Sequence, residues 1–248
     1  MRSVFRAAHG LLKTIQDRIA RNRRDHPGAQ LAMLLERARQ LGVPKGLRLD
    51  LGGGDGCYRE LLSSGGARAL TLDRFGGPRV DLIADVHALP VCGRVVGLIV
   101  LAEVLEHLAE PAVAVEECYR ALQPGGMLAI TTPQYWHVHK HPSDYYRFTD
   151  EGLRFLCERA GFEVVDCWSR GGPALIVFHA IECNLSERWR PLFVIPFHGL
   201  AEWIDRQTYD CRPTGSHYEA LGWSLLARKA SSPCVACDQA KPEAGVGE

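Results

Sequence analysis

The chain has 248 residues, of which 46% are apolar and 23% are charged, as in an ordinary globular protein, so disorder is not expected. The 29 Lys and Arg residues balance the 29 Asp and Glu residues, which excludes an overall charge that attracts nucleic acid and favours a small or neutral partner. The nine cysteines are scattered and odd in number, with no secretory leader ahead of them, so we expect reduced thiols and a cytoplasmic location.

The first predicted element is a basic amphipathic helix within residues 1–24, part of an N-terminal helical cap that spans residues 1–45. This stretch has seven basic residues and one acidic residue, and its apolar residues recur near helical spacing. A helix that caps the domain is the favoured interpretation, while a transit peptide and a membrane-surface helix are the alternatives.

Residues 46–230 alternate between strand-like and helix-like runs, which is typical of a parallel sheet with helices on both faces. Helices are expected to begin near residues 58 and 111 and after Thr149, which suits an N-cap position. Strands are expected at residues 47–51, 67–73, 80–85, 95–103, 126–133, 162–169 and 220–229. The prediction is a single α/β domain of Rossmann-like type with about seven strands.

The stretch RLDLGGGDG, residues 48–56, places four glycines directly after the first expected strand. Ligands of an open parallel sheet bind beyond the carboxyl ends of its strands, so Gly52, Gly54 and Gly56 would let a cofactor lie against bare main chain. A dinucleotide-binding loop needs a third glycine where this chain has Cys57. A nicotinamide-dependent oxidoreductase is therefore a disfavoured alternative.

The same loop has the form acidic-x-Gly-x-Gly-x-Gly and begins at Asp50, and the segments LTLD, ADVHALP, LAEVLEHL and LQPGGMLAITTP follow it in order. In these motifs the sequence resembles the class I S-adenosylmethionine (SAM) dependent methyltransferases of type 11, over about residues 46–170 and 220–229. The resemblance implies SAM as the cofactor, and a seven-stranded, mostly parallel sheet whose last strand is antiparallel.

The resemblance also implies roles for three acidic residues. Asp73 would accept hydrogen bonds from both ribose hydroxyls, Asp85 would receive the adenine amino group, and Glu103 belongs to the segment that lines the methionine end. The implied reaction is methyl transfer to an oxygen or nitrogen of a small-molecule or glycan acceptor, with no nucleic-acid partner. A non-catalytic binding module on the same fold is the alternative.

The segment AEVLEHL contains a cluster that could activate an acceptor. If a helical turn begins there, Glu103, Glu106 and His107 share one face at the mouth of the cofactor site. This ExxEH pattern looks like that of ubiquinone-pathway O-methyltransferases and of methyltransferases that modify small-RNA 3′ ends, in which these residues hold a divalent cation. Many relatives carry EHL without a metal, so a divalent metal is an alternative and a structural or SAM-contacting role is favoured.

Residues 134–152, which follow the expected strand at 126–133, gather three histidines and the pair Tyr145 and Tyr146 in a loop over the pocket. This loop could bind metal, shuttle protons, stack on a sugar, or simply dock the next helix. We expect His141 and Tyr145, together with His107, to lie near the acceptor.

A helical insertion is expected at residues 173–215, before the last strand. Its apolar runs are too short and too interrupted to span a membrane. A lid or a dimer surface is favoured over peripheral membrane contact. Residues 231–248 are rich in small and polar residues and are expected to form a disordered tail.

Overall fold

The computed structural model describes residues 26–54, 56–140, 142–208 and 219–231 of the 248-residue chain. The basic helix predicted within residues 1–24, His141, the end of the predicted insertion at 209–215, and all but the first residue of the predicted tail lie outside the described residues.

Seven strands form one sheet in the order β3-β2-β1-β4-β5-β7-β6. Strands β3, β2, β1, β4 and β5 are parallel to one another, and β7 is antiparallel to both β5 and β6. The strands are β1 (Leu47–Leu51), β2 (Ala69–Asp73), β3 (Leu82–Ile83), β4 (Val96–Ala102), β5 (Leu122–Pro133), β6 (Phe162–Arg170) and β7 (Gly222–Lys229). The prediction of a Rossmann-like sheet with an antiparallel last strand is confirmed.

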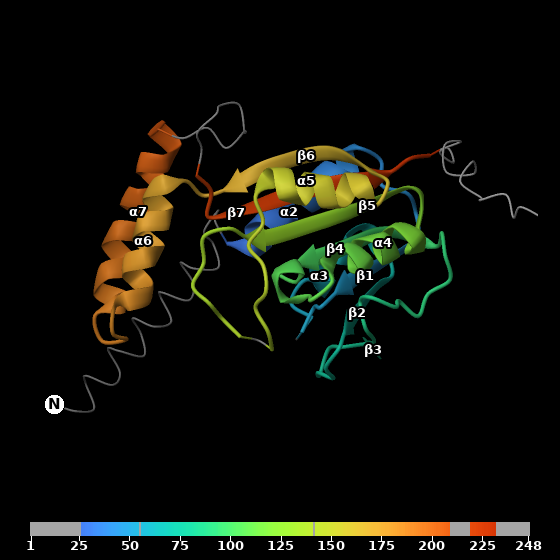
Figure 1. The fold of residues 1–248 in the computed structure, drawn as a ribbon, viewed down its shortest axis with the longest axis horizontal. Helices are drawn as coiled ribbons and strands as arrows, with labels where there is room; N and C mark the ends of the chain where they lie inside the picture. The colour runs from blue at the N-terminus through green and yellow to red at the C-terminus, as the bar shows by residue number, and fades with distance from the viewer. Residues whose placement is uncertain (1–25, 55, 141, 209–218, 232–248) are drawn as a thin grey trace, which may run out of the picture.

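Helices cover both faces of the sheet (Figure 1). They are α2 (Pro27–Gln40), α3 (Arg59–Leu62), α4 (Pro111–Ala121), α5 (Asp150–Arg159), α6 (Pro173–Asn184) and α7 (Arg190–Thr208). Side chains of α2 and α3 pack with Leu98 and Val100 of β4, while α4 and α5 pack on the side of Ile99 and Leu101. Successive β4 residues thus enter opposite cores, as expected for a strand buried on both faces.

Two strands differ most from their predicted bounds. The strand expected at 80–85 is reduced to the two exposed residues of β3, which forms one edge of the sheet. Strand β5 begins at Leu122 instead of 126, because Leu122 pairs with Val96 of β4 before the register shifts and Met127 pairs with Leu98. The four residues between Leu122 and Met127 bulge out of the ladder, and Gly125 there has a φ of 77°.

The hairpin of α6 and α7 stands beyond the carboxyl ends of the parallel strands (Figure 1). Its interior is a small apolar core that includes Phe178 and Val194. The carboxylate of Asp205 in α7 accepts hydrogen bonds from the backbone nitrogens of Gly172, Ala174 and Leu175, at 2.9, 2.8 and 3.1 Å. These contacts cap the amino end of α6 from a neighbouring helix.

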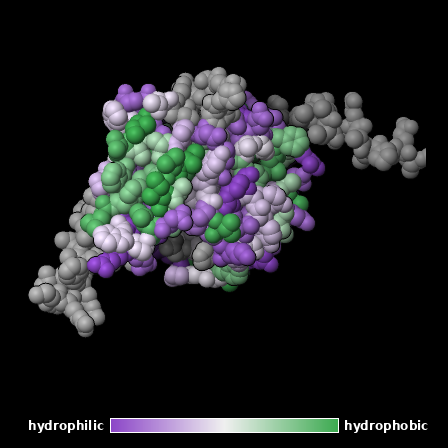
Figure 2. Space-filling view, turned by 60° about the vertical axis from the view of Figure 1, so that its left-hand side comes forward, coloured by the Kyte–Doolittle hydropathy of each residue, from purple (hydrophilic) through white to green (hydrophobic). Residues whose placement is uncertain are grey.

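The outer face of the hairpin exposes large apolar side chains, seen as a green area over α6 and α7 in Figure 2. Val177 of α6, and Leu192 and Trp203 of α7, are 59%, 57% and 58% exposed. Among the described residues, no helix combines the length and the apolar character needed to cross a membrane.

Candidate functional site

The glycine loop lies between the carboxyl end of β1 and helix α3, at the point where the strand order reverses between β1 and β4. Gly52, Gly54 and Gly56 have φ values of 71°, 54° and 69°. A Cβ at Gly52 would lie 2.7 Å from Val104, and one at Gly56 would lie 2.8 Å from Arg79, so these two glycines permit close packing within the protein. A Cβ at Gly54 would meet no atom within 4 Å, so its main chain is the part of the loop that is open to a ligand.

Asp73, the last residue of β2, faces this loop. Its Oδ2 accepts a hydrogen bond from the backbone nitrogen of Gly54 at 2.9 Å, and its Oδ1 accepts one from Phe75 at 2.8 Å. Asp50 is buried beneath the loop, where its Oδ2 would lie 2.4 Å from a Cβ at Gly53. Asp73 is therefore the acidic residue that borders the open main chain, whereas Asp50 supports the loop from below.

Asp85 follows β3 and is exposed. Its Oδ1 accepts a hydrogen bond from the backbone nitrogen of His87 at 2.9 Å and lies 2.6 Å from the Nδ1 atom of the same residue. These two hydrogen bonds lower the pKa of Asp85. The carboxylate is ionised and reachable, and it follows the strand that neighbours β2.

These residues fit an adenosyl group. A nucleoside with two vicinal hydroxyls needs acceptor oxygens beside a main chain that it can approach closely, and Asp73 beside Gly54 provides both. The exposed carboxylate of Asp85 can accept hydrogen bonds from an amino group.

Glu103 follows β4 and has a φ of 57°, a conformation that is uncommon for residues other than glycine. Its two carboxylate oxygens accept hydrogen bonds from Nη1 and Nη2 of Arg170, the last residue of β6, at 2.9 and 3.0 Å. Arg170 is only 2% exposed. The sequence predicted that Glu103 shares a face with Glu106 and His107, but the structure pairs Glu103 with Arg170.

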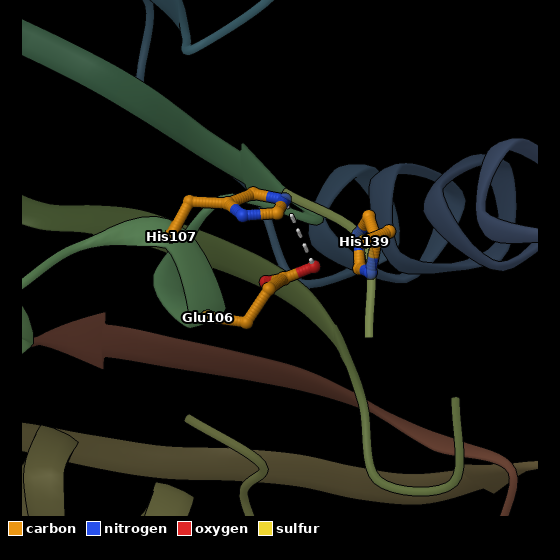
Figure 3. A group of neighbouring side chains, drawn as sticks. All are labelled: Glu106, His107 and His139. Carbon is orange, nitrogen blue, oxygen red and sulfur yellow. Dashed lines mark ion pairs between the residues drawn. The ribbon is translucent and has the colours of Figure 1, made fainter. Parts of the chain in front are cut away.

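Glu106 and His107 instead lie beside His139, which comes from the loop after β5 (Figure 3). One ligand atom from each of the three side chains lies within 4.8 Å of the others. Glu106 is fully buried, and its Oε1, 3.8 Å from the Nε2 of His107, has no hydrogen-bond partner among the described residues. Burial raises the pKa of Glu106 to about 8, and the negative charge of Glu103 adds to the shift.

Both imidazoles of this cluster are oriented through Nδ1. The Nδ1 of His107 contacts the carbonyl oxygen of Ser143, and the Nδ1 of His139 lies 3.2 Å from the carbonyl oxygen of His137 and 3.5 Å from Oδ2 of Asp144. An Nδ1–H that donates to an oxygen leaves Nε2 as the lone-pair nitrogen, which is the arrangement of metal-bound histidines. Within the described part of the chain, this is the cluster whose donors fit a metal ion.

An ion pair holds the loop that carries His139. The guanidinium of Arg147 donates to both carboxylate oxygens of Asp144, at 2.5 and 2.8 Å, and Asp144 also accepts the backbone N–H of His139. The Arg147 hydrogen bonds hold the pKa of Asp144 well below its usual range. The backbone of Tyr145 donates to the carbonyl oxygen of Glu106, while its side chain remains 55% exposed.

A cavity of about 660 Å³ lies between the sheet edge and the α6–α7 hairpin. Glu103 and Arg170 line it from the strands, and Trp136 and His137 line it from the loop after β5. The hairpin supplies His179, Glu182, Cys183, Asn184 and Arg190, the start of α2 supplies His26 and Pro27, and Leu221 lies directly before β7. This volume suits a small molecule.

The predicted site residues therefore fall into separate groups. Gly54 and Asp73 are in direct contact, Glu103 lines the cavity, and His107 belongs to the three-residue cluster. The loop of His139 was considered for metal binding, but its meeting with Glu106 and His107, and the pairing of Arg170 with Glu103, were missed. The partners lie 33 or fewer and 67 positions apart in the chain, beyond any local spacing rule.

Known proteins resemble this chain chiefly in the region of the glycine loop. A family model described as a methyltransferase domain matches residues 49–130. A probable SAM-dependent methyltransferase of Mycolicibacterium smegmatis is 31% identical over 134 residues, which cover 48% of this chain and 52% of that protein. The malonyl-[acyl-carrier protein] O-methyltransferase of Methylococcus capsulatus is 34% identical over 114 residues, covering 40% and 42%. The chain thus spans about half the length of the curated relatives it matches.

Solved structures share the fold at low identity. A SAM-dependent methyltransferase from Archaeoglobus fulgidus has a TM-score of 0.54 at 16% identity, with 88% of this chain and 99% of that chain covered. The 1,6-didemethyltoxoflavin-N1-methyltransferase of Burkholderia thailandensis, solved with its substrate and S-adenosylhomocysteine, has a TM-score of 0.52 at 17% identity, covering 92% and 87%. Residues 49–130 thus match the methyltransferase domain family, and the solved structures show that the sheet as a whole has the fold found in SAM-dependent methyltransferases.

Proposed function

We propose that the protein transfers the methyl group of SAM to an oxygen or nitrogen atom of a small molecule or glycan. The observation that carries the proposal is the contact between Asp73 and the open main chain of Gly54, at the strand ends where this fold binds its ligand. The relatives named above are methyltransferases, and one neighbouring structure holds S-adenosylhomocysteine.

In this proposal, the chain's residues bind the cofactor and align the acceptor. Asp73 accepts hydrogen bonds from the ribose hydroxyls, and Asp85 accepts a hydrogen bond from the adenine amino group. The Gly52–Gly56 loop borders the methionine part of the cofactor. When bound, SAM supplies an activated methyl group, so the protein mainly has to align the acceptor atom and remove a proton where one is released. We retain His107, His141 and Tyr145 as predicted neighbours of the acceptor.

Isothermal titration with S-adenosylhomocysteine tests the cofactor site. Asp73→Asn should weaken binding about 10- to 100-fold, because a neutral amide replaces a charged acceptor of two hydroxyls. Gly54→Val should weaken it at least as strongly, because its side chain would occupy the open side of the loop. Gly42→Val is the matched control, since Gly42 also has a positive φ of 78° and nothing within 4 Å of a Cβ, but follows α2.

Wild-type affinity in both site variants, or no binding by the wild-type protein, would overturn the cofactor assignment. Tight binding of S-adenosylhomocysteine without turnover of SAM on any acceptor panel would instead favour the non-catalytic binding module.

We also propose that Glu106, His107 and His139 hold a divalent metal ion beside the acceptor site. Oε1 of buried Glu106, which accepts no hydrogen bond from the described part of the chain, and one nitrogen from each imidazole would supply one carboxylate and two imidazole ligands. Such a ligand set suits Zn²⁺ or Mn²⁺ better than Mg²⁺, which prefers oxygen ligands. A bound cation would offset the cost of burying the Glu106 carboxylate and could lower the pKa of an acceptor hydroxyl.

The metal content of the protein distinguishes a metal-binding role of these three residues from a purely structural role. Protein dialysed against Zn²⁺ or Mn²⁺ and then freed of excess ion should retain about one ion per chain, measured by plasma mass spectrometry. His139→Ala and Glu106→Gln should lose it, whereas His87→Ala, which removes an imidazole paired with Asp85 outside the cluster, should retain it. Equal metal content in all four proteins would contradict the proposal.

A further inference from the structure

Among the described residues that line the cavity beside the α6–α7 hairpin, one arginine forms no ion pair. The other charged side chains of the lining each lie beside a polar partner. Glu103 is bound by Arg170 through two hydrogen bonds, and Glu182 lies 3.2 Å from the Nδ1 of His179.

Arg190 is the remaining charged residue of the lining. Within the part of the chain that the structure describes, it forms no ion pair, and its Nε is buried without a hydrogen-bond partner. A buried donor on a charged group is costly to leave unsatisfied, so the site favours a bound acceptor of hydrogen bonds. Arg190 is also the first residue of α7, where the helix dipole adds partial positive charge.

His137 also lines the cavity, and its imidazole can donate or accept a hydrogen bond.

The cavity also has a flat wall. The ring of Trp136 lies 5.1 Å from that of His137 and 5.0 Å from that of His179, measured between centroids. Trp136 is 36% exposed, so part of this residue is accessible. Aromatic walls of this kind pack against planar rings and the apolar faces of sugars.

We propose that the methyl acceptor is an anionic small molecule whose carboxylate or phosphate group binds Arg190, while its ring packs against Trp136. The proposal rests on the methyltransferase function, which it narrows from small molecules and glycans in general to acidic ones. The planar guanidinium of Arg190 can donate two parallel hydrogen bonds to a carboxylate or phosphate group. The acceptor atom would then lie toward Glu103, the lining residue that follows β4.

Paired probes that differ in charge test this inference. Glucuronate and glucose 6-phosphate, each compared with glucose, and 4-hydroxybenzoate, compared with 4-hydroxybenzamide, are titrated into protein saturated with S-adenosylhomocysteine. At least one anionic probe should bind about tenfold or more tightly than its neutral counterpart. The glucuronate and glucose 6-phosphate arms then tell a carboxylate from a phosphate.

Variants of Arg190 test whether this residue causes the preference for anionic probes. Arg190→Gln should abolish the preference for the anionic probe, and Arg190→Lys should retain part of it because the charge remains. Arg188→Gln is the matched control, since Arg188 lies two residues earlier, stacks on exposed Trp189 and does not line the cavity.

Three results would overturn the proposal: equal binding of charged and neutral probes, an unchanged preference in Arg190→Gln, or no binding of any probe to the cofactor-loaded protein. Failure of S-adenosylhomocysteine to bind the wild-type protein is a separate result, which would remove the methyltransferase function itself.

Discussion

Arg170 donates hydrogen bonds from both terminal nitrogens to the carboxylate of Glu103, at 2.9 and 3.0 Å. The pair joins the ends of β4 and β6, which are separated in the sheet by β5 and β7. It therefore ties the antiparallel edge of the sheet to the residue that follows a central parallel strand, and it forms one wall of the cavity.

Glu103→Gln should lower the free energy of unfolding by about 2 to 4 kcal/mol, because the buried guanidinium of Arg170 loses its counter-charge. The double variant Glu103→Gln, Arg170→Met should recover part of that loss, since no uncompensated charge remains. Urea unfolding of the single and double variants measures both effects. A double variant less stable than the sum of the two single losses would contradict this explanation.

Adjacent glycines of the loop should respond differently to alanine. A Cβ at Gly53 would lie 2.4 Å from Oδ2 of Asp50 and 2.6 Å from Cγ2 of Thr71, so Gly53→Ala should destabilise the fold by about 1 to 3 kcal/mol through overpacking. Gly54→Ala meets no atom and should cost only about 1 kcal/mol for its positive φ. Urea unfolding ranks the two variants, and the opposite order would show that backbone strain outweighs packing here.

The ion pair of Asp144 with Arg147 should make stability depend on pH. Because the pKa of Asp144 is held below its usual range, the pair stabilises the fold above the ordinary aspartate pKa and loses this effect as the pH falls through the native value. Asp144→Asn should therefore cost about 1 to 3 kcal/mol at pH 7, and the difference from wild type should narrow below about pH 4. Denaturant unfolding at pH 7, 4 and 3 measures the difference in stability between the wild-type protein and Asp144→Asn.

Glu163→Gln is the control for that experiment. Glu163 pairs with Arg228 at the surface and its side chain is 61% exposed, so its loss should change stability by less than about 1 kcal/mol. A difference between wild type and Asp144→Asn that stays constant from pH 7 to pH 3 would contradict the assignment.

Asp205→Ala should loosen the α6–α7 hairpin. Its carboxylate is 6% exposed and caps three backbone nitrogens at the start of α6, so about 1 to 3 kcal/mol of local stability should be lost. Hydrogen exchange of the amides in residues 172–178 should accelerate, while exchange in β4 stays slow. Glu202→Ala, which breaks only the surface pair with Arg206, should leave both unchanged.

The sheet and its cofactor loop could be predicted because both depend on local patterns. Alternating apolar runs mark the strands, and the loop glycines stand directly after Leu51 of β1. The side-chain partners could not be predicted in the same way. A positive φ at Glu103 directs its carboxylate to Arg170, and the loop after β5 brings His139 to Glu106, so both contacts depend on the finished fold.

The spacing of residues in the sequence also did not predict long-range contacts between helices and strands. Gln30 of α2 accepts a hydrogen bond from Nε1 of Trp168 in β6, across 138 positions of the chain, and its Oε1 also lies 3.3 Å from the hydroxyl of Ser224 in β7. A buried glutamine in an otherwise apolar helix face indicates a polar partner, but it does not say which strand supplies one.

Cys57, the residue that breaks the dinucleotide pattern, has an exposed thiol directly after Gly56. An occupant of the glycine loop should shield this sulfur from a small alkylating reagent such as iodoacetamide. The rate at which the peptide containing Cys57 gains mass therefore reports on loop occupancy in the unaltered protein, with exposed Cys92, in the segment before β4, as an internal reference. A faster or slower alkylation of Cys57 would thus reveal whether the glycine loop is empty or occupied, without any change to the sequence.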